Sequence, residues 1–424
     1  MLKAFLNSFR IPDLRNKILF TLFIIVVYRF GNHVPVPVVD TTQLQNSANT
    51  SGFLDFINLF SGGGLTRFSV FALGIMPYIT SSIIMQLLTV VIPKLQQWQD
   101  EGEAGVKKTN QWTRYLTVVL ALLQSTGLVF LFHSQQNGLP DLFPVSTFTW
   151  ENVLLIVLTM TAGTALIMWL GELITQRGVG NGMSIIIFTS VISRLPFEGS
   201  AILRAGGAGK FIVVLLIGIG IIVAVVYMDQ GQRKVPVQYA KRVVGRKQMM
   251  GGSTYLPLKV NQAGVIPIIF ATSVLYFPVL IASVYHQQWF QDFVNKYVQN
   301  QRSILYMLIL ASLIVFFSYF YTAIQFDPVR TADNLRKQGG FVPGIRPGPP
   351  TADYLNDILV RITLPGSLFL AAIALIPTIV LATWNFQQFP FGGTSILIAV
   401  GVALETMKQI ESQLMMRHYE GFLR

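Results

Sequence analysis

Residues 362–404 read ITLPGSLFLAAIALIPTIVLATWNFQQFPFGGTSILIAVGVAL and contain no charged side chain. A helix that crosses a membrane needs roughly 20 apolar residues, so this stretch is long enough for two crossings. Trp384, Asn385 and the glycines Gly392 and Gly393 interrupt it at the point where the chain would turn. The stretch therefore predicts a helical protein that crosses a membrane repeatedly.

The composition of the whole chain of 424 residues agrees with that prediction. Hydrophobic residues make up 52% and charged residues only 12%, whereas soluble domains carry about 25% charged residues. So few charges cannot cover a water-exposed surface, which excludes an ordinary soluble enzyme and a disordered chain. Long apolar runs also exclude a β-barrel, whose strands alternate over segments of about ten residues. The chain has no cysteine, which excludes disulfides and zinc–cysteine sites.

The apolar runs predict ten transmembrane helices. The fifth run is too short for a full crossing, and we expect its glycine-rich entrance, Gly178 to Gly182, to supply the rest. Residues 1–17 precede the first run with apolar side chains at helical spacing, which predicts a short cytoplasmic helix on the inner membrane surface. The ten runs lie at about 18–37, 68–92, 115–132, 153–170, 183–193, 211–228, 261–285, 304–326, 362–383 and 393–413.

Positive charge is distributed unevenly between the two sides of the predicted membrane. The chain has a net charge of +12. If the N-terminus is cytoplasmic, the segments on that side hold 24 of the 31 lysines and arginines, and the external loops hold 6. Cytoplasmic loops of membrane proteins are enriched in these two residues. We therefore expect both termini in the cytoplasm.

Two short motifs occur once in each half of the chain. Residues 74–79 (GIMPYI) and 264–269 (GVIPII) share the pattern G-x-x-P-x-I in the second span of each half. In the fifth spans, the shared pattern is G-x-S-I, at Gly182 and at Gly393. Five spans per half invert the second half relative to the first, and inverted repeats place a pathway between the halves. We therefore predict an all-α polytopic membrane protein with ten transmembrane helices, in two inverted five-helix halves around a central pore. The halves would cover residues 18–193 and 211–416.

The predicted spans hold almost no ionisable side chain, which separates the candidate functions. Arg29 and Glu405 are the only charges at any depth, whereas a coupled carrier normally keeps ionisable groups near the midplane. The sequence suggests no nucleotide fingerprint, no metal-ligand cluster and no nucleophile–base pair. We therefore expect no enzyme activity, no catalytic residue, no metal and no cofactor. A passage for another molecule fits best. An inverted-repeat secondary solute transporter would need a polar midplane site, and a non-conducting scaffold would not need an apolar constriction.

Two basic cytoplasmic loops are longer than a connection between helices requires. They span residues 229–259, with seven lysines and arginines against one acid, and residues 327–361, which several prolines stiffen. Membrane topology and attraction to anionic lipids explain part of this charge. We expect the loops to be a docking surface for a large cytoplasmic partner, and a polyanion such as ribosomal RNA would suit their charge.

Four stretches of the chain resemble the SecY family, whose members form the centre of protein-conducting channels. Residues 69–88 (SVFALGIMPYITSSIIMQLL) and 169–186 (WLGELITQRGVGNGMSII) resemble its two signature stretches. Residues 331–335 (TADNL) and 341–348 (FVPGIRPG) provide two further matches in the second basic loop. The resemblance covers nearly the whole chain. It implies a channel in the bacterial cytoplasmic membrane that conducts unfolded secretory polypeptides and releases membrane segments sideways into lipid.

The resemblance also implies a closed constriction made of apolar side chains. An apolar ring loses its water and blocks ions without binding the polar chains that pass through it. Matched motif by motif, the ring would consist of Ile75, Ile79, Met183, Ile187, Ile269 and Ile398. A segment at about residues 54–68, too short to cross a membrane, resembles the family's plug on the external side of the ring. Its candidate residues are Phe56, Ile57, Leu59, Phe60, Gly62 and Gly63.

Two further sets of residues follow from the resemblance. A lateral gate between spans 2–3 and 7–8 would carry three polar residues that bond to one another when closed: Thr80, Gln124 and Asn261. Docking of the motor ATPase SecA or of the ribosome would use basic residues of the two loops: Arg242, Arg246, Lys247, Arg336 and Arg346. The implied partners are the SecE and SecG subunits, signal peptides, unfolded polypeptides and membrane lipids.

Overall fold

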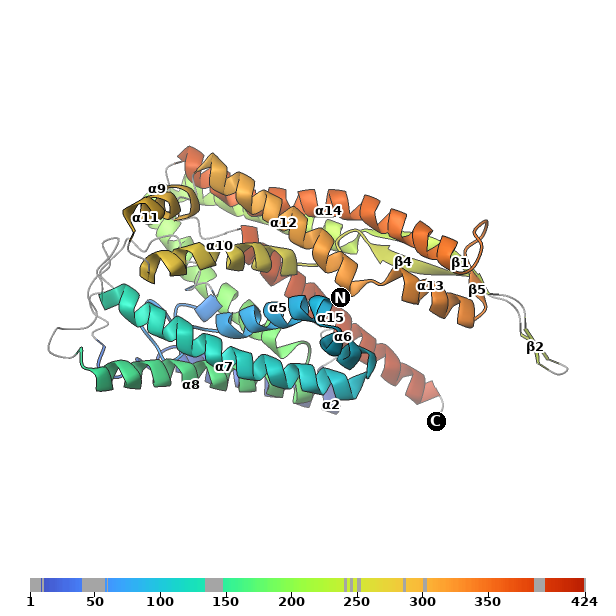
Figure 1. The fold of residues 1–424 in the computed structure, drawn as a ribbon, viewed down its shortest axis with the longest axis horizontal. Coiled ribbons are helices and arrows are strands. Elements are labelled where there is room, and N and C mark those ends of the chain that lie inside the picture. Colours follow the sequence, from blue (N-terminus) through green and yellow to red (C-terminus); the bar gives the residue numbers. More distant parts are fainter. Residues whose placement is uncertain are drawn as a thin grey trace.

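The computed structural model describes residues 9, 11–39, 58, 60–133, 148–239, 242–244, 247–249, 253–284, 287–299, 303–384 and 393–422. Its long helices run side by side, and a small β-sheet projects from one end of the bundle (Figure 1). By length and composition, five helices of the described part can cross a membrane: Glu103–His133, Trp150–Arg177, Gly207–Gln230, Ile304–Lys337 and Pro349–Ile376. Three shorter apolar helices accompany them, namely Met76–Val91, Gly182–Pro196 and Ile266–Leu275.

Each of the ten predicted apolar runs overlaps a helix of the described part, and the number of membrane crossings stays a prediction. The fifth and sixth both lie on α9, which is divided where Gly207 takes a positive φ of 72°. The helices that carry the spans are α2 (Pro12–Gly31), α5 (Met76–Val91), α7 (Glu103–His133), α8 (Trp150–Arg177), α9 (Gly182–Gln230), α10 (Ile266–Val284), α12 (Ile304–Gln325), α14 (Pro349–Trp384) and α15 (Gly393–Phe422). Shorter helices are α6 (Pro93–Asp100), α11 (Gln288–Val294), the π-helix η2 (Asn295–Gln299) and α13 (Pro328–Lys337).

Several predicted ends of spans were wrong. The first span was predicted to about residue 37, but α2 ends at Gly31, and the seventh was predicted from about residue 261, but α10 begins at Ile266. Residues 70–75 of the second predicted span form turns, and helix α5 begins only at Met76. The glycine-rich entrance does not extend the fifth span, because α9 begins at Gly182, where the Asn181 side chain accepts hydrogen bonds from the first turn. The missing length comes from the other end, where the helix continues past residue 193. The expected surface helix at 1–17 lies mostly outside the described residues, apart from the start of α2.

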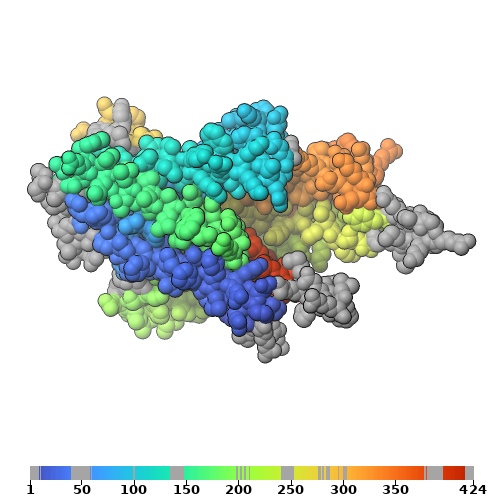
Figure 2. Space-filling model, turned by 90° about the horizontal axis from the view of Figure 1, so that it is seen from below, coloured from blue at the N-terminus to red at the C-terminus, as the bar shows by residue number. Residues whose placement is uncertain are grey.

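The helices group by their position in the chain. In the first half, α7 packs against α5 and α8, and in the second half, α12 packs against α10 and α14. Figure 1 shows these groups as two layers, with α15 crossing between them. Figure 2 shows the outer face of the first layer, with α2 in blue and α8 in green lying next to one another. Each layer has its own buried apolar core, which includes Phe132 and Met160 in one layer and Leu310 and Ile314 in the other.

The repeated motifs occupy equivalent places in the two halves. Gly74 and Gly264 take positive φ values of 57° and 62°, and helices α5 and α10 each begin two residues later. A residue without a Cβ adopts this left-handed conformation at little cost. The following proline falls in the first helical turn, where its missing N–H is not needed. The second motif likewise begins α9 at Gly182 and α15 at Gly393. Corresponding helices in the two halves therefore begin at the same sequence motifs.

The two basic loops fold together around a sheet that was not predicted. Strands β1 (Gln232–Tyr239) and β4 (Ser253–Lys259) pair antiparallel, with Val235 opposite Leu256, and β5 (Gly340–Phe341) pairs with the other edge of β1. A hairpin of β2 (Arg242–Val244) and β3 (Lys247–Met249) lies between β1 and β4 in the chain. Buried side chains of the sheet, Val235 and Leu258, pack against Leu355 and Leu359 of α14. The loops therefore form one folded unit that rests on the start of α14.

Candidate functional site

An apolar cluster where the two halves meet contains all six predicted ring residues. They come from α5 and the residue before it, from α9, from α10 and from α15. Ile75, Ile187 and Ile398 are buried, while Ile79, Met183 and Ile269 are half-buried at its inner surface. Positions four residues apart on a helix share one face, which explains why 75 with 79 and 183 with 187 point the same way. The structure thus brings together residues that are more than 300 positions apart in the chain.

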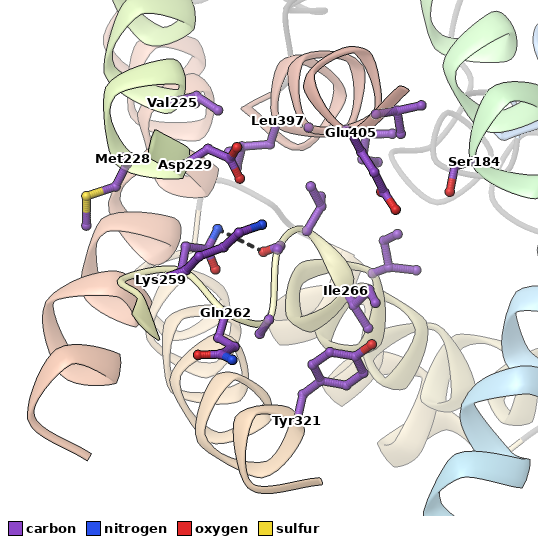
Figure 3. Close-up of a pocket in the computed structure, with 18 of the residues that line it drawn as sticks. Ser184, Val225, Met228, Asp229, Lys259, Gln262, Ile266, Tyr321, Leu397 and Glu405 are labelled. Carbon is purple, nitrogen blue, oxygen red and sulfur yellow. Dashed lines mark hydrogen bonds between the residues drawn. The ribbon is translucent and has the colours of Figure 1, made fainter. Parts of the chain in front are cut away.

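A cavity of about 400 Å³ extends from this cluster to Lys259, the last residue of β4. Ile187, Ile269 and Ile398 contribute to its lining. The rest of the lining is rich in polar groups from several elements, and Figure 3 shows Asp229, Lys259 and Glu405 directed toward the same space. The cavity is therefore a water-compatible chamber with an apolar floor.

One ion pair at the edge of the chamber links two helices. Lys408 Nζ of α15 donates to Asp229 Oδ2 of α9 at 2.7 Å, and the Asp229 side chain is only 19% exposed. Such a pair is less screened by solvent than one on an open surface. The sequence did not single out Asp229, because it lies at the end of a span and its partner is 179 positions away. The one sequence feature that could have indicated this ion pair is that Asp229 and Lys408 both lie at the margins of apolar runs.

The segment predicted as a plug lies against the apolar cluster. Phe56, Ile57 and Leu59 fall outside the described residues. Phe60 is 1% exposed and belongs to the same apolar cluster as the six ring residues. Farther along, Leu65 and Phe68 are buried in the core of the first half. Main-chain hydrogen bonds of 2.9 Å join Val36 N to Phe68 O and Val70 N to Val34 O, which ties the end of the segment to the chain after α2.

The plug segment approaches the start of α5 so closely that only glycine fits. A Cβ built on Gly74 would lie 2.7 Å from the carbonyl oxygen of Phe60 and 2.8 Å from Cα of Ser61. These are backbone atoms, so they can give way only if the segment itself moves. Gly62 and Gly63 both take positive φ, at 63° and 89°, and form the turn that follows Ser61. Gly62 and Gly63 therefore allow the backbone turn in the segment, and the absence of a side chain at Gly74 leaves room for the segment against the start of α5. We call this contact at Gly74 the seat of the segment.

The three predicted gate residues are near the contact between the halves, but their hydrogen bonds go elsewhere. Thr80 is buried in α5 and its hydroxyl donates to its own helix, at Met76 O, over 3.0 Å. Asn261 lines the cavity and donates to Gly264 O at 3.2 Å. Gln124 is buried in α7. Among the described residues, the mutual bonding that we expected is not made. Contact between α7 and α10, and between Ile83 of α5 and the core of the second half, closes the seam instead.

The predicted docking residues lie in the folded unit of the two loops. Arg336, near the end of α13, has an exposed side chain 3.9 Å from Asp333. Arg346 is exposed in the turn between β5 and α14, where its carbonyl accepts a hydrogen bond of 2.8 Å from Thr351. Arg242 and Lys247 belong to the β2–β3 hairpin, and Arg246 falls outside the described residues.

The seat of the plug segment gives a direct structural prediction. We expect Gly74→Ala to displace the segment, because the new methyl group would collide with the backbone of Phe60 and Ser61. Since the chain has no cysteine, Leu65→Cys, at a position 2% exposed, provides a single thiol whose labelling rate reports the displacement. That rate should rise several-fold in the double variant.

Gly264→Ala is the matched control for this measurement. It has nearly the same φ, but a Cβ there meets no atom within 4 Å. Both substitutions cost backbone strain of about 1–2 kcal/mol, so strain alone would affect both. Equal labelling of the Gly74→Ala and Gly264→Ala variants would contradict the proposed seat.

Solved structures with the same fold are protein-conducting channels. One solved protein-conducting channel is 16% identical to this chain, with coverage of 94% of this chain and 92% of that one and a TM-score of 0.63. The structure of Sec61 in the canine ribosome–channel complex is 15% identical with the same coverage and a TM-score of 0.60. At these identities, the matches establish the fold and the arrangement of the helices.

Sequence relatives are much closer. The chain is 51% identical over 444 aligned positions to the protein translocase subunit SecY of Mycobacterium tuberculosis (strain ATCC 25618 / H37Rv), with 100% of both chains covered. It is 52% identical over 443 positions to the corresponding subunit of Streptomyces coelicolor (strain ATCC BAA-471 / A3(2) / M145), again over 100% of both chains. The family model named SecY matches residues 69–407. The chain therefore belongs to the SecY family of protein translocase subunits.

Proposed function

We propose that the apolar cluster between the two halves is the closed constriction of a channel through which unfolded polypeptides cross the bacterial cytoplasmic membrane. One observation carries the proposal. Six side chains from four separated segments form one apolar cluster, which supplies three residues to the lining of a polar chamber and also contains the buried Phe60. A seal of this kind uses no hydrogen bond or ion pair, so a passing chain can separate it without leaving a buried polar group unpaired.

The parts on either side of the constriction would act in sequence. The chamber, with Asn181, Ser184 and Glu405 in its lining, would receive the hydrated polypeptide from the cytoplasm. Apolar walls narrower than a hydrated ion lose their water and stop ion flow. The segment at 54–68 would act as the plug that closes the external side at rest. Hydrophobic segments would leave for the lipid through the seam between α5 and α7 on one side and α10 and α12 on the other.

The polar residues at that seam would tune its opening. Thr80 and Gln124 are buried there without a bond across the seam in the described structure, so parting the helices exposes polar groups that water or a signal segment can satisfy. We infer that these residues, with Asn261, add no polar bond across the closed seam, so that a signal peptide need not break one to open it.

Orientation and partners complete the proposal. Both termini and the unit formed by residues 229–259 and 327–361 would face the cytoplasm, which the distribution of lysine and arginine supports. SecA and the ribosome would dock on this unit through Arg336, Arg346 and the β2–β3 hairpin, and ribosomal RNA would be attracted by its charge. The matched Sec61 was solved in a ribosome–channel complex, which supports a ribosomal partner. SecE and SecG would hold the two halves, residues 18–193 and 211–416, together.

No reaction is assigned to this chain, since the channel requires only a passage, and ATP hydrolysis would belong to SecA. The solute-transporter alternative requires a polar midplane site. The chamber is polar, but its floor is the apolar ring, and its charged pair Asp229–Lys408 lies where α9 ends. Membership of a translocase family favours the channel over the transporter.

Photo-crosslinking during translocation tests the pathway. With a photoreactive side chain at Ile79, a stalled secretory polypeptide should crosslink through its mature region. With the probe at Thr80, the same polypeptide should crosslink through its signal segment. A probe at Leu216, which is 61% exposed on the outer face of α9, should give neither product. Absence of both products from an inserted, folded protein would revive the transporter.

Ion conductance tests the seal. Ile79→Ser and Ile398→Ser each place a hydroxyl in the apolar ring, which favours wetting, so we expect the resting leak in a planar bilayer to rise several-fold. Signal selectivity should relax at the same time. Ile314→Ser makes the same exchange at a fully buried position in the core of the second half and should leave the leak unchanged. An unaltered leak in both ring variants would remove the ring assignment.

Charge reversal tests the docking unit. Arg346→Glu should block motor-driven export while the protein stays inserted, because its exposed cation would become an anion at the proposed SecA contact. Arg361→Glu, at a side chain 78% exposed near the membrane end of the same loop, serves as the control and should export normally. Normal export by the Arg346→Glu variant would exclude that residue from the docking step.

A further inference from the structure

The guanidinium of Arg29 joins three segments that are far apart in the chain. Arg29 lies in the last turn of α2. Its Nη1 donates to the carbonyl oxygen of Gly62 at 3.0 Å and to Ser193 Oγ of α9 at 2.9 Å. One cation at the end of a membrane helix therefore contacts both the plug segment and a helix that supplies two ring residues.

The position of this cation is fixed without the plug segment. Ser193 Oγ donates to Ser190 O at 2.8 Å within α9. The hydroxyl of Tyr28, the residue before Arg29, forms a buried hydrogen bond of 2.7 Å with Ser190 Oγ. Helices α2 and α9 are thus held together by a second polar contact. The bond from Arg29 to Gly62 is the part of the arrangement that can break while the helices stay in place.

The chemistry of the contact favours a strong but reversible hold. A hydrogen bond from a charged donor is shorter and stronger than a neutral one, and this one lies where the guanidinium is half-buried. Its acceptor is a backbone carbonyl, so the hold does not depend on any side chain of the plug segment. When the segment leaves, Arg29 keeps Ser193 as a partner, and water can replace the lost carbonyl.

We propose that Arg29 is the latch that holds the plug segment on the closed constriction through the Gly62 carbonyl. The inference rests on the plug and ring roles proposed above. Opening the channel must break this bond, so its strength adds directly to the free energy that separates the closed channel from the open one. Arg29 is therefore a positioning residue that sets how rarely the channel opens without a substrate.

The alternative is that Arg29 is only a strut between α2 and α9. Tyr28→Phe distinguishes the two readings, because it removes a hydrogen bond between the same two helices and leaves the plug contact intact. A strut would make both substitutions equivalent. A latch would make only the substitution of Arg29 release the segment.

The test uses the full chain in its native membrane, with Leu65→Cys as the reporter. An impermeant thiol reagent labels this buried position only when the segment leaves its seat, and Arg67→Cys, at an exposed position, controls for reagent access. We expect Arg29→Met to raise the labelling rate about tenfold, which corresponds to about 1.4 kcal/mol, and to raise the resting ion leak in parallel. Arg29→Lys, which keeps the charge with a shorter reach, should lie between Arg29→Met and the parent. Tyr28→Phe should match the parent.

Two results would overturn the latch. One is parental labelling and leak in an inserted Arg29→Met protein. The other is equal labelling of the Tyr28→Phe and Arg29→Met variants, which would establish the strut. The ring variants distinguish failure of the latch from failure of the proposed channel. If the Ile79→Ser variant leaks ions and the Arg29→Met variant does not, only the latch is excluded. If neither variant leaks, the proposed seal falls as well.

Discussion

The two halves of this protein meet through an apolar contact around Ile75, Ile187 and Ile398. Dispersion and exclusion of water hold such a contact together, and neither demands a fixed set of partners. If polar side chains closed the channel instead, each passing polypeptide would have to replace the hydrogen bonds between them. The same constraint accounts for the sparse charge in the spans, since the charges that remain lie at the margins of the contact. Asp229 and Lys408 lie toward the chamber, and Arg29 lies on the side of the plug segment.

Much of this arrangement could be predicted from the sequence. The fold class and the family were confirmed by the helical structure and the comparisons. The two repeated motifs were informative because a positive φ followed by proline leaves few choices for the backbone, and both copies start helices in the same way. The ring residues were found only by matching those motifs, because isoleucine is common throughout the spans. The structure gathers them in one cluster, and their role as a seal stays a prediction.

Other features depend on contacts that no local pattern records. The chamber draws its lining from α9, α10, α12, α14 and α15 and from the segment before α10. Residues 70–75 looked helical because they are apolar, yet Val70 N bonds to Val34 O in the chain after α2, and Ala72 and Gly74 bond within local turns. Val235 and Val237 lie two positions apart in β1 and are both buried. This spacing of apolar residues is visible in the sequence, but the high charge of the loop obscured it. The hydrogen bonds of Thr80 and Asn261 were decided by their nearest carbonyls, not by each other.

The folded unit of the two basic loops belongs to one half of the molecule. Its strands leave α9 and enter α10, its helix α13 follows α12, and its core rests on α14. The described contacts of its sheet are with elements of the second half. A partner bound to this unit would therefore be attached to the second half and not to the first. In the part of the chain that the structure describes, the projecting sheet is carried by the second half, so a force applied to the sheet would act as a lever across the seam between the halves.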